Sequence, residues 1–371
     1  MKIALVHDWL TGMRGGEKVL LELLRLFPAA DVFTLLWKRG SVSPEIEARV
    51  RQTSFLDRLP RVTDAYRYYL PLFPAAVRSL DLAGYDLVIS SSHAVAKGVR
   101  APAGAMHVSY VHTPMRYLWE SSADYFQFGR GRWWKRAALG AIAPWLRHFD
   151  RESASGVNFF IANSENVRGR IRRIYGADAK VIYPPVNTSF FTPGGEASAG
   201  DYYLVASSLE PYKRIDLAVD AFARGRRRLV IAGQGTLEGQ LRARARRAPH
   251  APLEFLGEVS DEKLRDLYRH CRALIFPGLD DFGMTPVEAQ ACGRPVVCYG
   301  AGGALETVID GETGIHFPSQ TSAALLDAVE RLEKTPWDVA RIRAHSLRFS
   351  RERFQDEMRR FLCDIGVPIA A

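Results

Sequence analysis

Short apolar runs rich in β-branched residues alternate with amphipathic stretches along the chain, and this alternation occurs twice. Strands that are almost wholly apolar require a sheet covered on both faces, and strands separated by helical stretches are typical of parallel α/β folds. A turn-rich stretch, Val186–Asp201, separates the two series. The sequence therefore predicts two open α/β domains joined by a linker, at 1–190 and 191–371, with the last helix a candidate to pack back on the first domain.

The strands predicted before the linker are Ile3–His7, Asp31–Leu36, Asp86–Ser91, His107–His112, Asn158–Ala162 and Val181–Tyr183. Those predicted after it are Tyr202–Ala206, Leu229–Ala232, Leu253–Leu256, Ala273–Phe276 and Val296–Tyr299. Open parallel sheets bind ligands beyond the carboxyl ends of their strands. We therefore expect the substrate to bind in a cleft between the two domains.

The net charge of +9 is unevenly distributed: residues 1–190 hold 26 Lys and Arg against 16 Asp and Glu, and residues 191–371 hold 24 against 25. This excess points to an anionic partner for the first domain, which could be a nucleic acid, a membrane surface or a phosphorylated substrate. The alternative is a general bias in composition, since Arg outnumbers Lys 41 to 9.

Several classes of protein are not expected. The N-terminus runs out of apolar residues too soon for a signal peptide, and the longest apolar run, Ala137–Leu146, is about half a bilayer span. The four cysteines show no CxxC spacing and lie mostly among apolar residues, as reduced core cysteines do. We expect a cytosolic protein.

Two glycine-rich segments follow predicted strands. Gly15 and Gly16 come directly before a helix, where free N–H groups favour an anion, although a plain strand-to-helix turn explains them equally well. The second segment, Gly233–Gly239, resembles a dinucleotide fingerprint, with Glu254 further on. It follows the second strand of its domain rather than the first, so a turn is the preferred interpretation.

Charged residues at two junctions of the second domain suit a nucleotide sugar. Lys213 and Arg214 stand at a strand-to-helix junction, where cations and the helix dipole together favour a diphosphate; solvated side chains are the alternative. Asp280 and Glu288 flank seven other residues. We expect Asp280 to cap the following helix, and Glu288 to lie just over one turn inside it. The amides of Gly283, Met284 and Thr285 and the two carboxylates could then bind hydroxyls and a diphosphate.

The segment 277–293 resembles the acidic–seven–acidic motif of retaining glycosyltransferases of family 4. The sequence PYKRIDLAVDAF at 211–222 is similar to the diphosphate-binding segment of that family. YVHTPMRYLW at 110–119 and VIYPPV at 181–186 resemble its mannosyltransferase-like branch in bacterial polysaccharide synthesis. The motifs occur in order over nearly the whole chain.

The resemblance implies the GT-B fold, with two Rossmann-like domains facing across a cleft and C-terminal helices. It implies three residues at the reacting centre: Lys213 neutralises the leaving diphosphate, Asp280 grips the donor sugar with the amides of Gly283, Met284 and Thr285, and His112 reaches the sugar. Glu288 would hold the ribose, Arg214 would add positive charge, and Gly15 and Gly16 would close over the distal phosphate.

The chain departs from the family pattern at two positions. The family usually has Glu where this chain has Asp280, and often Arg beside the diphosphate where this chain has Ser208. These departures leave open a weakened enzyme, altered donor choice or a noncatalytic scaffold that binds nucleotide sugars. The sequence offers no nucleophilic triad and no clustered metal ligands, so we expect transfer without a covalent intermediate, a metal or a cofactor.

The donor that the resemblance favours is GDP-mannose, with UDP-sugars as the alternative. For the acceptor side, basic residues interleave with aromatic ones at 58–73 and again at Arg130, Arg132 and Trp133–Arg136. This pattern suits an anionic membrane surface, with solvated arginines and core aromatics as the alternative. We expect peripheral docking on the inner membrane face and a saccharide acceptor, lipid-linked or soluble. Nucleic-acid binding is disfavoured because no recognition motif is present.

Overall fold

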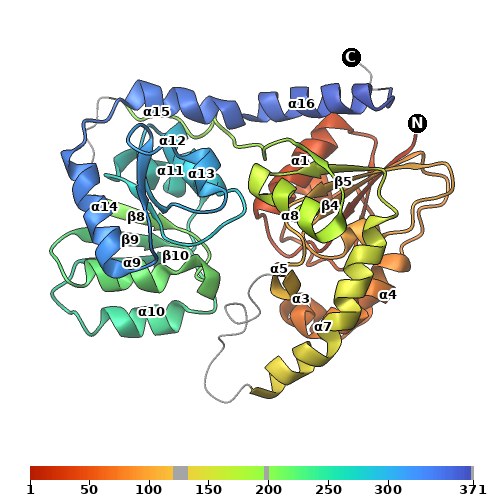
Figure 1. Cartoon of the computed structure of the whole chain (residues 1–371), viewed down its shortest axis with the longest axis horizontal. Helices are drawn as coiled ribbons and strands as arrows, with labels where there is room; N and C mark the ends of the chain where they lie inside the picture. Colours follow the sequence, from red (N-terminus) through yellow and green to blue (C-terminus); the bar gives the residue numbers. More distant parts are fainter. Residues whose placement is uncertain (120–132, 196–199, 369–371) are drawn as a thin grey trace. The chain divides into compact units, whose positions relative to one another are not determined.

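The computed structural model describes residues 1–119, 133–195 and 200–368 (Figure 1). By its internal contacts the chain divides into two compact units. Unit 1 comprises Met1–Pro185 together with Phe354–Ala371, and unit 2 comprises Val186–Arg353. Each unit is built on one parallel sheet, so we describe each by itself.

Unit 1 contains a seven-stranded sheet in the order β3-β2-β1-β4-β5-β6-β7, with every pairing parallel. Its strands are β1 Ile3–His7, β2 Asp31–Thr34, β3 Val50–Thr53, β4 Leu87–Ser92, β5 Met106–Val111, β6 Phe159–Ala162 and β7 Ala179–Val181. Its described helices are α1 Gly15–Leu26, α2 Pro44–Glu47, α3 Val62–Ala65, α4 Phe73–Arg78, α5 Arg116–Trp119, α7 Trp133–Ala154 and α8 Glu165–Tyr175, with 3-10 turns η1 Phe55–Arg58, η2 Tyr66–Leu72 and η3 Ala96–Gly98.

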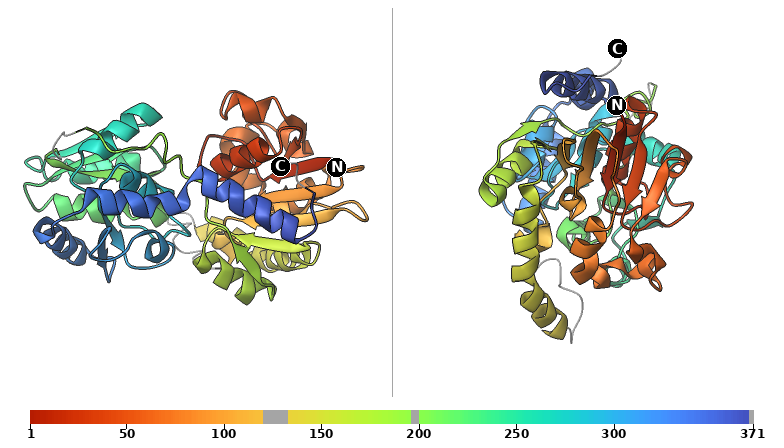
Figure 2. Two further views of the ribbon diagram at one scale, coloured as in Figure 1. Left: turned by 90° about the horizontal axis from the view of Figure 1, so that it is seen from above. Right: turned by 90° about the vertical axis from the view of Figure 1, so that its right-hand side faces the viewer.

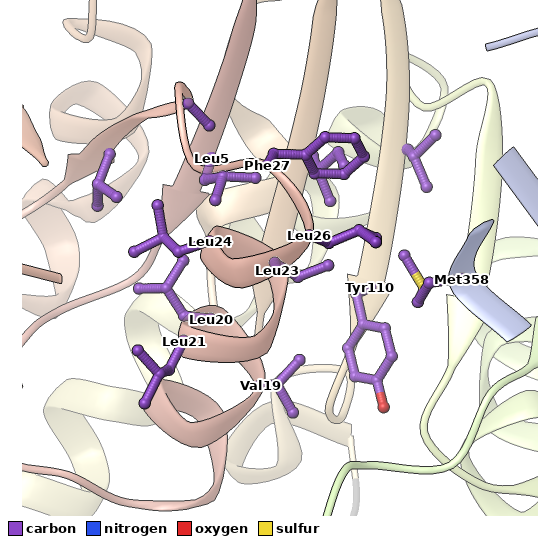
Figure 3. Packing of buried hydrophobic residues seen from close by; sticks show 14 of the residues in the cluster. Leu5, Val19, Leu20, Leu21, Leu23, Leu24, Leu26, Phe27, Tyr110 and Met358 are labelled. Carbon is purple, nitrogen blue, oxygen red and sulfur yellow. The ribbon is translucent and has the colours of Figure 1, made fainter. Parts of the chain in front are cut away.

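The two faces of the sheet of unit 1 are covered by different parts of the chain. On one face α1 packs its buried leucines against the sheet, beside Tyr110 and Met358 (Figure 3). Met358 belongs to α16, Arg351–Asp364, whose Phe354 and Leu362 are buried in the same cluster. Figure 2 shows this last helix running beside the strands of unit 1. The other face is covered by residues from α4, η3 and α7.

Unit 2 contains a six-stranded parallel sheet in the order β10-β9-β8-β11-β12-β13. Its strands are β8 Tyr202–Ala206, β9 Arg228–Ala232, β10 Leu253–Gly257, β11 Leu274–Phe276, β12 Val296–Tyr299 and β13 Gly314–Phe317. Its helices are α9 Ile215–Phe222, α10 Glu238–Ala245, α11 Asp261–His270, α12 Met284–Ala291, α13 Ala304–Thr307, α14 Ser322–Lys334 and α15 Val339–Ser346, with 3-10 turns η4 Pro211–Lys213 and η5 Leu347–Phe349. Two buried apolar clusters form its core, one on each side of the sheet.

Two strands, β3 and β13, were not predicted from the sequence, and several others begin or end one or two residues from their predicted bounds. β3 was missed because its central residues, Arg51 and Gln52, are polar, as an edge strand allows. β13 is the edge strand of the other sheet and begins with a glycine. The strand predicted at Val181–Tyr183 pairs earlier, as β7.

A buried carboxylate joins the two central strands of unit 1. β1 and β4 are neighbours, and the chain proceeds outward from them in opposite directions, which makes their junction the switch point of the sheet. Asp8 follows β1 directly and is fully buried. Its Oδ2 accepts hydrogen bonds from the amides of His93 (2.7 Å) and Ala94 (2.9 Å), and its Oδ1 from those of Val95 and Ala96 (both 2.7 Å). One side chain thereby satisfies four backbone donors in the loop after β4.

We expect Asp8→Asn to lower the free energy of unfolding of unit 1 by about 2–4 kcal/mol, because the amide can accept at only one atom and leaves buried donors unpaired. Urea unfolding followed by tryptophan fluorescence would measure this, since six of the seven tryptophans belong to unit 1.

The matched control is Asp86→Asn. Asp86 is exposed and accepts one backbone hydrogen bond, from Lys2 N at 2.6 Å, at the opposite end of the same strand pair. Its substitution should cost about 0.5 kcal/mol or less. Equal losses in the two variants would contradict the role given to Asp8.

Candidate functional site

The junction between β8 and α9 presents the two cations predicted there. The turn η4 ends at Lys213, and Arg214 adopts a left-handed conformation (φ 50°) before α9 begins. Such a conformation is uncommon for a residue with a side chain and tends to occur at functional sites. The Nε of Arg214 lies 3.3 Å from Asp216 Oδ1, so Arg214 forms an ion pair with the first turn of the helix that follows it.

Lys213 and Asp280, two residues predicted to act at the reacting centre, are in direct contact. Lys213 Nζ donates a hydrogen bond to Asp280 Oδ2, and both side chains are largely buried, 14% and 18% exposed. Gly278 makes this approach possible, because a Cβ there would lie 2.8 Å from Lys213 Cα. The loop after β11 can therefore pack directly against the turn that carries Lys213.

The prediction that Asp280 caps α12 is wrong. The N-cap residue is Gly283, with φ 91°, and no side chain caps this helix. Asp280 pairs instead with Lys213, a partner 67 residues away that local sequence spacing does not reveal. The first amides of α12, at Met284 and Thr285, belong to the turn of the helix that lacks intrahelical acceptors.

Glu288 lies on α12 as predicted, just over one turn from its start, and is almost fully buried (3% exposed). Tyr268, on α11, donates a hydrogen bond from its hydroxyl to Glu288 Oε2 at 3.1 Å. Burial, together with the neighbouring Glu288, raises the pKa of Tyr268 well above its usual value, so its hydroxyl keeps the proton that it donates. Tyr268 was not foreseen, because an aromatic residue in an amphipathic helix looks like core.

Other glycines of unit 2 also serve close packing. Gly302 and Gly303 lie against the 280–282 loop, where a Cβ on Gly303 would come within 2.3 Å of Phe282 Cα. Gly303 N also donates to Asp280 O at 2.9 Å. In the dinucleotide-like segment, a Cβ on Gly233 would lie 1.9 Å from Ser207 O. Steric need therefore explains Gly233 without a ligand, in agreement with its interpretation as a turn.

Within unit 1 the predicted residue His112 follows β5 directly and belongs to a buried polar cluster. Its Nε2 lies 2.8 Å from Ser91 Oγ, and the same hydroxyl lies 3.1 Å from His7 Nδ1. Sheet register explains the contact, because His7 at the end of β1 pairs with Ser91 in β4. Ser91 and His7 were not predicted, since each comes from a different strand.

Gly15 and Gly16 begin α1, and Gly16 lies beside this cluster. A Cβ on Gly16 would come 3.1 Å from His7 Cε1 and 3.7 Å from His112 Nε2. Glu17 follows in α1 and is buried, with its Oε1 3.8 Å from His7 Nε2. The structure thus places Gly16 close to His112 and adds Glu17 and His7 as their neighbours.

Burial lowers the pKa of two histidines of this cluster, His112 and His93. Burial, with His93 and His7 close by, holds the pKa of His112 well below its usual value. Burial also lowers the pKa of His93, although its Nδ1 lies 3.2 Å from Asp8 Oδ2 and that charge acts in the opposite direction. Burial alone would raise the pKa of Glu17, but His7 and His93 bring it below the usual value, so Glu17 is a carboxylate.

The basic and aromatic residues at 58–73 divide into two groups. Tyr66 packs on Trp9, with ring centroids 4.8 Å apart, and Tyr69 donates a hydrogen bond to Pro60 O, so these two rings hold the segment in place. Phe73 is buried, whereas Arg58, Arg61, Arg67, Tyr68 and Leu72 are exposed. Arg130 and Arg132 lie outside the described residues, and α7 begins at Trp133.

Two absences concern the described part of the chain, residues 1–119, 133–195 and 200–368. There, no three His, Cys, Asp or Glu side chains lie close enough together to hold a metal ion. No helix in that part has both the length and the apolar character needed to cross a membrane.

Two protein-family models together match most of the chain. Residues 13–190 match the model described as Glycosyltransferase Family 4, and residues 189–348 match the model described as Glycosyl transferases group 1. The two matches meet at the start of the predicted linker and together include all the predicted site residues.

Curated relatives share part of their length with this chain. A D-inositol 3-phosphate glycosyltransferase of Streptomyces bingchenggensis is 31% identical over 205 residues, covering 47% of this chain and 45% of the relative. One from Acidothermus cellulolyticus is 33% identical over 211 residues, covering 47% and 46%. The chain therefore spans about half the length of the curated relatives that it matches.

Solved structures match over nearly the whole length. Anabaena HepE in complex with UDP aligns with a TM-score of 0.72 at 18% identity, covering 98% of this chain and 100% of that one. Sucrose-phosphate synthase of Thermosynechococcus elongatus aligns with a TM-score of 0.73 at 17% identity, covering 98% and 99%. At these identities the likeness concerns the fold, two Rossmann-like units with parallel sheets. The chain belongs to glycosyltransferase family 4 and has the GT-B fold.

Proposed function

We propose that the chain transfers a hexose from a nucleoside diphosphate sugar to a saccharide acceptor, with retention of configuration at the anomeric carbon. The observation that carries this proposal is the contact of Lys213 with Asp280 beside the first turn of α12, one helix turn from the buried Glu288. A cation, helix amides and two carboxylates are the groups that a diphosphate joined to a sugar and a ribose requires.

In the proposed reaction the bond between the anomeric carbon and the diphosphate oxygen breaks, and the acceptor oxygen bonds to that carbon on the same face. The acceptor proton passes to the leaving diphosphate, so no enzyme nucleophile is needed. Negative charge grows on the diphosphate, and Lys213 with the α12 amides would stabilise it. Without donor, Asp280 neutralises Lys213; a bound diphosphate would replace this carboxylate and leave Asp280 to accept hydrogen bonds from the sugar.

Two donor classes are candidates. The resemblance of 110–119 and 181–186 to the mannosyltransferase-like branch favours GDP-mannose. UDP-sugars are favoured by the likeness in fold to HepE, which was crystallised with UDP and with UDP-glucose. For the acceptor we propose a polyprenyl-diphosphate-linked saccharide of a cell-surface polysaccharide, with transfer at the inner face of the cell membrane.

Lys213→Ala should lower kcat by about 100-fold or more, because a cation at the leaving group contributes a few kcal/mol to the transition state. Transfer from radiolabelled GDP-mannose and UDP-glucose to lipid extracts would measure it. Lys263→Ala, which removes an exposed lysine of the same unit, serves as the control. Unchanged turnover would remove Lys213 from the mechanism, and transfer from neither donor, with intact nucleotide binding, would favour the scaffold alternative.

A thermal-shift series with GDP, UDP and ADP should identify the base, because a ligand that binds only the folded state stabilises it by about 2.7 kcal/mol at 100 times its Kd. Glu288→Gln should reduce the shift given by the preferred nucleotide, since the ribose hydroxyls lose a charged acceptor. Glu262→Gln, an exposed position on α11, is the control. If the nucleotide raised the melting temperature of the wild-type protein, Glu288→Gln and Glu262→Gln equally, the ribose role of Glu288 would be contradicted.

For membrane docking, the proposal rests on the exposed arginines at 58–67 together with Tyr68 (65% exposed) and Leu72 (41% exposed). Arg58→Ala combined with Arg67→Ala should weaken binding to anionic vesicles roughly 30-fold, at about 1 kcal/mol per cation near the surface. Sedimentation with phosphatidylglycerol vesicles at low and high salt would measure it. Leu305→Ser, at an exposed apolar residue of unit 2, should have no effect, and salt-insensitive binding or no binding would contradict the proposal.

A further inference from the structure

Tyr268, near the end of α11, occupies a position that would suit a phenylalanine. It is fully buried and belongs to the apolar cluster on one side of the sheet of unit 2. Its ring meets that of Phe191 edge to face, with centroids 5.7 Å apart and ring planes at 76°. Phenylalanine would fill the same space without the cost of taking a hydroxyl group out of water. The packing of the core therefore does not explain the hydroxyl of Tyr268.

The partner of this hydroxyl is a predicted site residue. Within the described residues the hydroxyl makes one hydrogen bond, to Glu288 Oε2 at 3.1 Å. Glu288 lies in the middle of α12 and is 3% exposed, so the contact joins two neighbouring helices inside the protein. A contact at one carboxyl oxygen restricts the rotation of the whole carboxyl group.

The rigidity of the Tyr268 ring matters for binding. A glutamate side chain has several rotatable bonds, and ordering such a side chain when a ligand binds costs free energy. The ring of Tyr268 is already fixed by the core around it. A hydrogen bond from this ring to Glu288 therefore orders the carboxyl group before any ligand arrives.

We infer that Tyr268 is a positioning residue: its hydroxyl holds the Glu288 carboxyl group ready for the ribose hydroxyls of the donor, and so makes the site select ribonucleotides over deoxyribonucleotides. The inference rests on the proposed function, in which Glu288 binds the ribose. Tyr268 is fully buried, so it acts through Glu288 and does not contact the ligand itself.

Arg343, on α15, holds both sides of this hydrogen bond in place. Its NH1 donates to Phe191 O at 2.7 Å and to Ala291 O at 2.8 Å. Phe191 packs against the ring of Tyr268, and Ala291 is the last residue of the helix that carries Glu288. One guanidinium group thus ties the support of the ring to the end of α12, which keeps the hydroxyl and the carboxyl group at a fixed separation.

Unit 2 also contains a matched control. Tyr203, on β8, is 1% exposed and donates a hydrogen bond from its hydroxyl to Glu333 Oε1 at 2.7 Å. Tyr203 is the second residue of its strand, whereas Lys213 follows the carboxyl end of the same strand. Tyr203→Phe therefore removes the same kind of hydrogen bond from the same domain without altering the candidate site.

Crystal structures of the whole chain without nucleotide would test the positioning directly. We expect one conformation of the Glu288 side chain in the wild-type protein and in Tyr203→Phe, and two or more in Tyr268→Phe. A single, unchanged conformation of Glu288 in Tyr268→Phe would overturn the inference. This measurement uses no ligand, so its result does not depend on the proposed function.

Calorimetric titration would test the selectivity, with GDP, UDP and the dideoxy form of each, which lacks both ribose hydroxyls. The wild-type protein should bind the ribose form of its preferred nucleotide at least about tenfold more tightly than the dideoxy form. Tyr268→Phe should weaken binding of the ribose form about five- to tenfold and change that of the dideoxy form by less than about twofold. Tyr203→Phe should behave as wild type.

The other outcomes are also decisive. Equal weakening of the two forms in Tyr268→Phe, or an unchanged affinity for the ribose form, would overturn the inference, because the hydroxyl would then serve the fold alone. A wild-type protein that bound both forms equally would overturn the ribose role of Glu288 as well. A wild-type protein that bound no nucleotide would overturn the proposed function and the selectivity, while the crystal structures would still decide whether Tyr268 positions Glu288.

Turnover separates positioning from catalysis. Contacts to the ribose are the same before and during the transfer of the sugar, so their loss weakens donor binding rather than the chemical step. Tyr268→Phe should therefore raise the KM for the donor about five- to tenfold and change kcat by less than about twofold. A lower kcat at unchanged KM would overturn the role given to Tyr268.

Discussion

The buried carboxylate of Asp8 is the interaction on which the rest of unit 1 depends. It holds the loop after β4 against the end of β1, at the point where the order of the strands reverses. On its far side the same loop is held by Lys97, which is fully buried and pairs with Asp150 on α7. With β1 and β4 fixed in this register, His7 and Ser91 lie opposite each other, and Ser91 also contacts His112.

Much of the fold could be predicted from the sequence because buried parallel strands are continuous apolar runs. The edge strands β3 and β13 could not, since an edge strand tolerates Arg51 and Gln52 or a leading glycine. The cap assigned to Asp280 failed for another reason. Spacing along a helix is local information, whereas the ion pair with Lys213 depends on how two loops of unit 2 meet.

Within the candidate site, too, some residues could be predicted from the sequence and others could not. Residue types that bind anions and hydroxyls were recognisable in Lys213, Glu288 and the first turn of α12. The glycines were harder to interpret, because a missing side chain can admit either a ligand or another part of the protein. At Gly278 and Gly16 the missing side chain makes room for another part of the protein: the backbone of Lys213 packs against Gly278, and the ring of His7 packs against Gly16. Tyr268 and Ser91 could not be singled out from the sequence, because each contacts a residue that belongs to another element.

The route of α16 has a consequence for biosynthesis. The apolar cluster under α1 includes Phe354, Met358 and Leu362, which the ribosome adds more than 160 residues after the end of β7. Unit 2 is contiguous in sequence and can complete its core while it emerges, whereas unit 1 exposes an unfinished apolar face until α16 arrives. The first unit to be synthesised is therefore the last to be finished, and the apolar face under α1 stays uncovered during that interval.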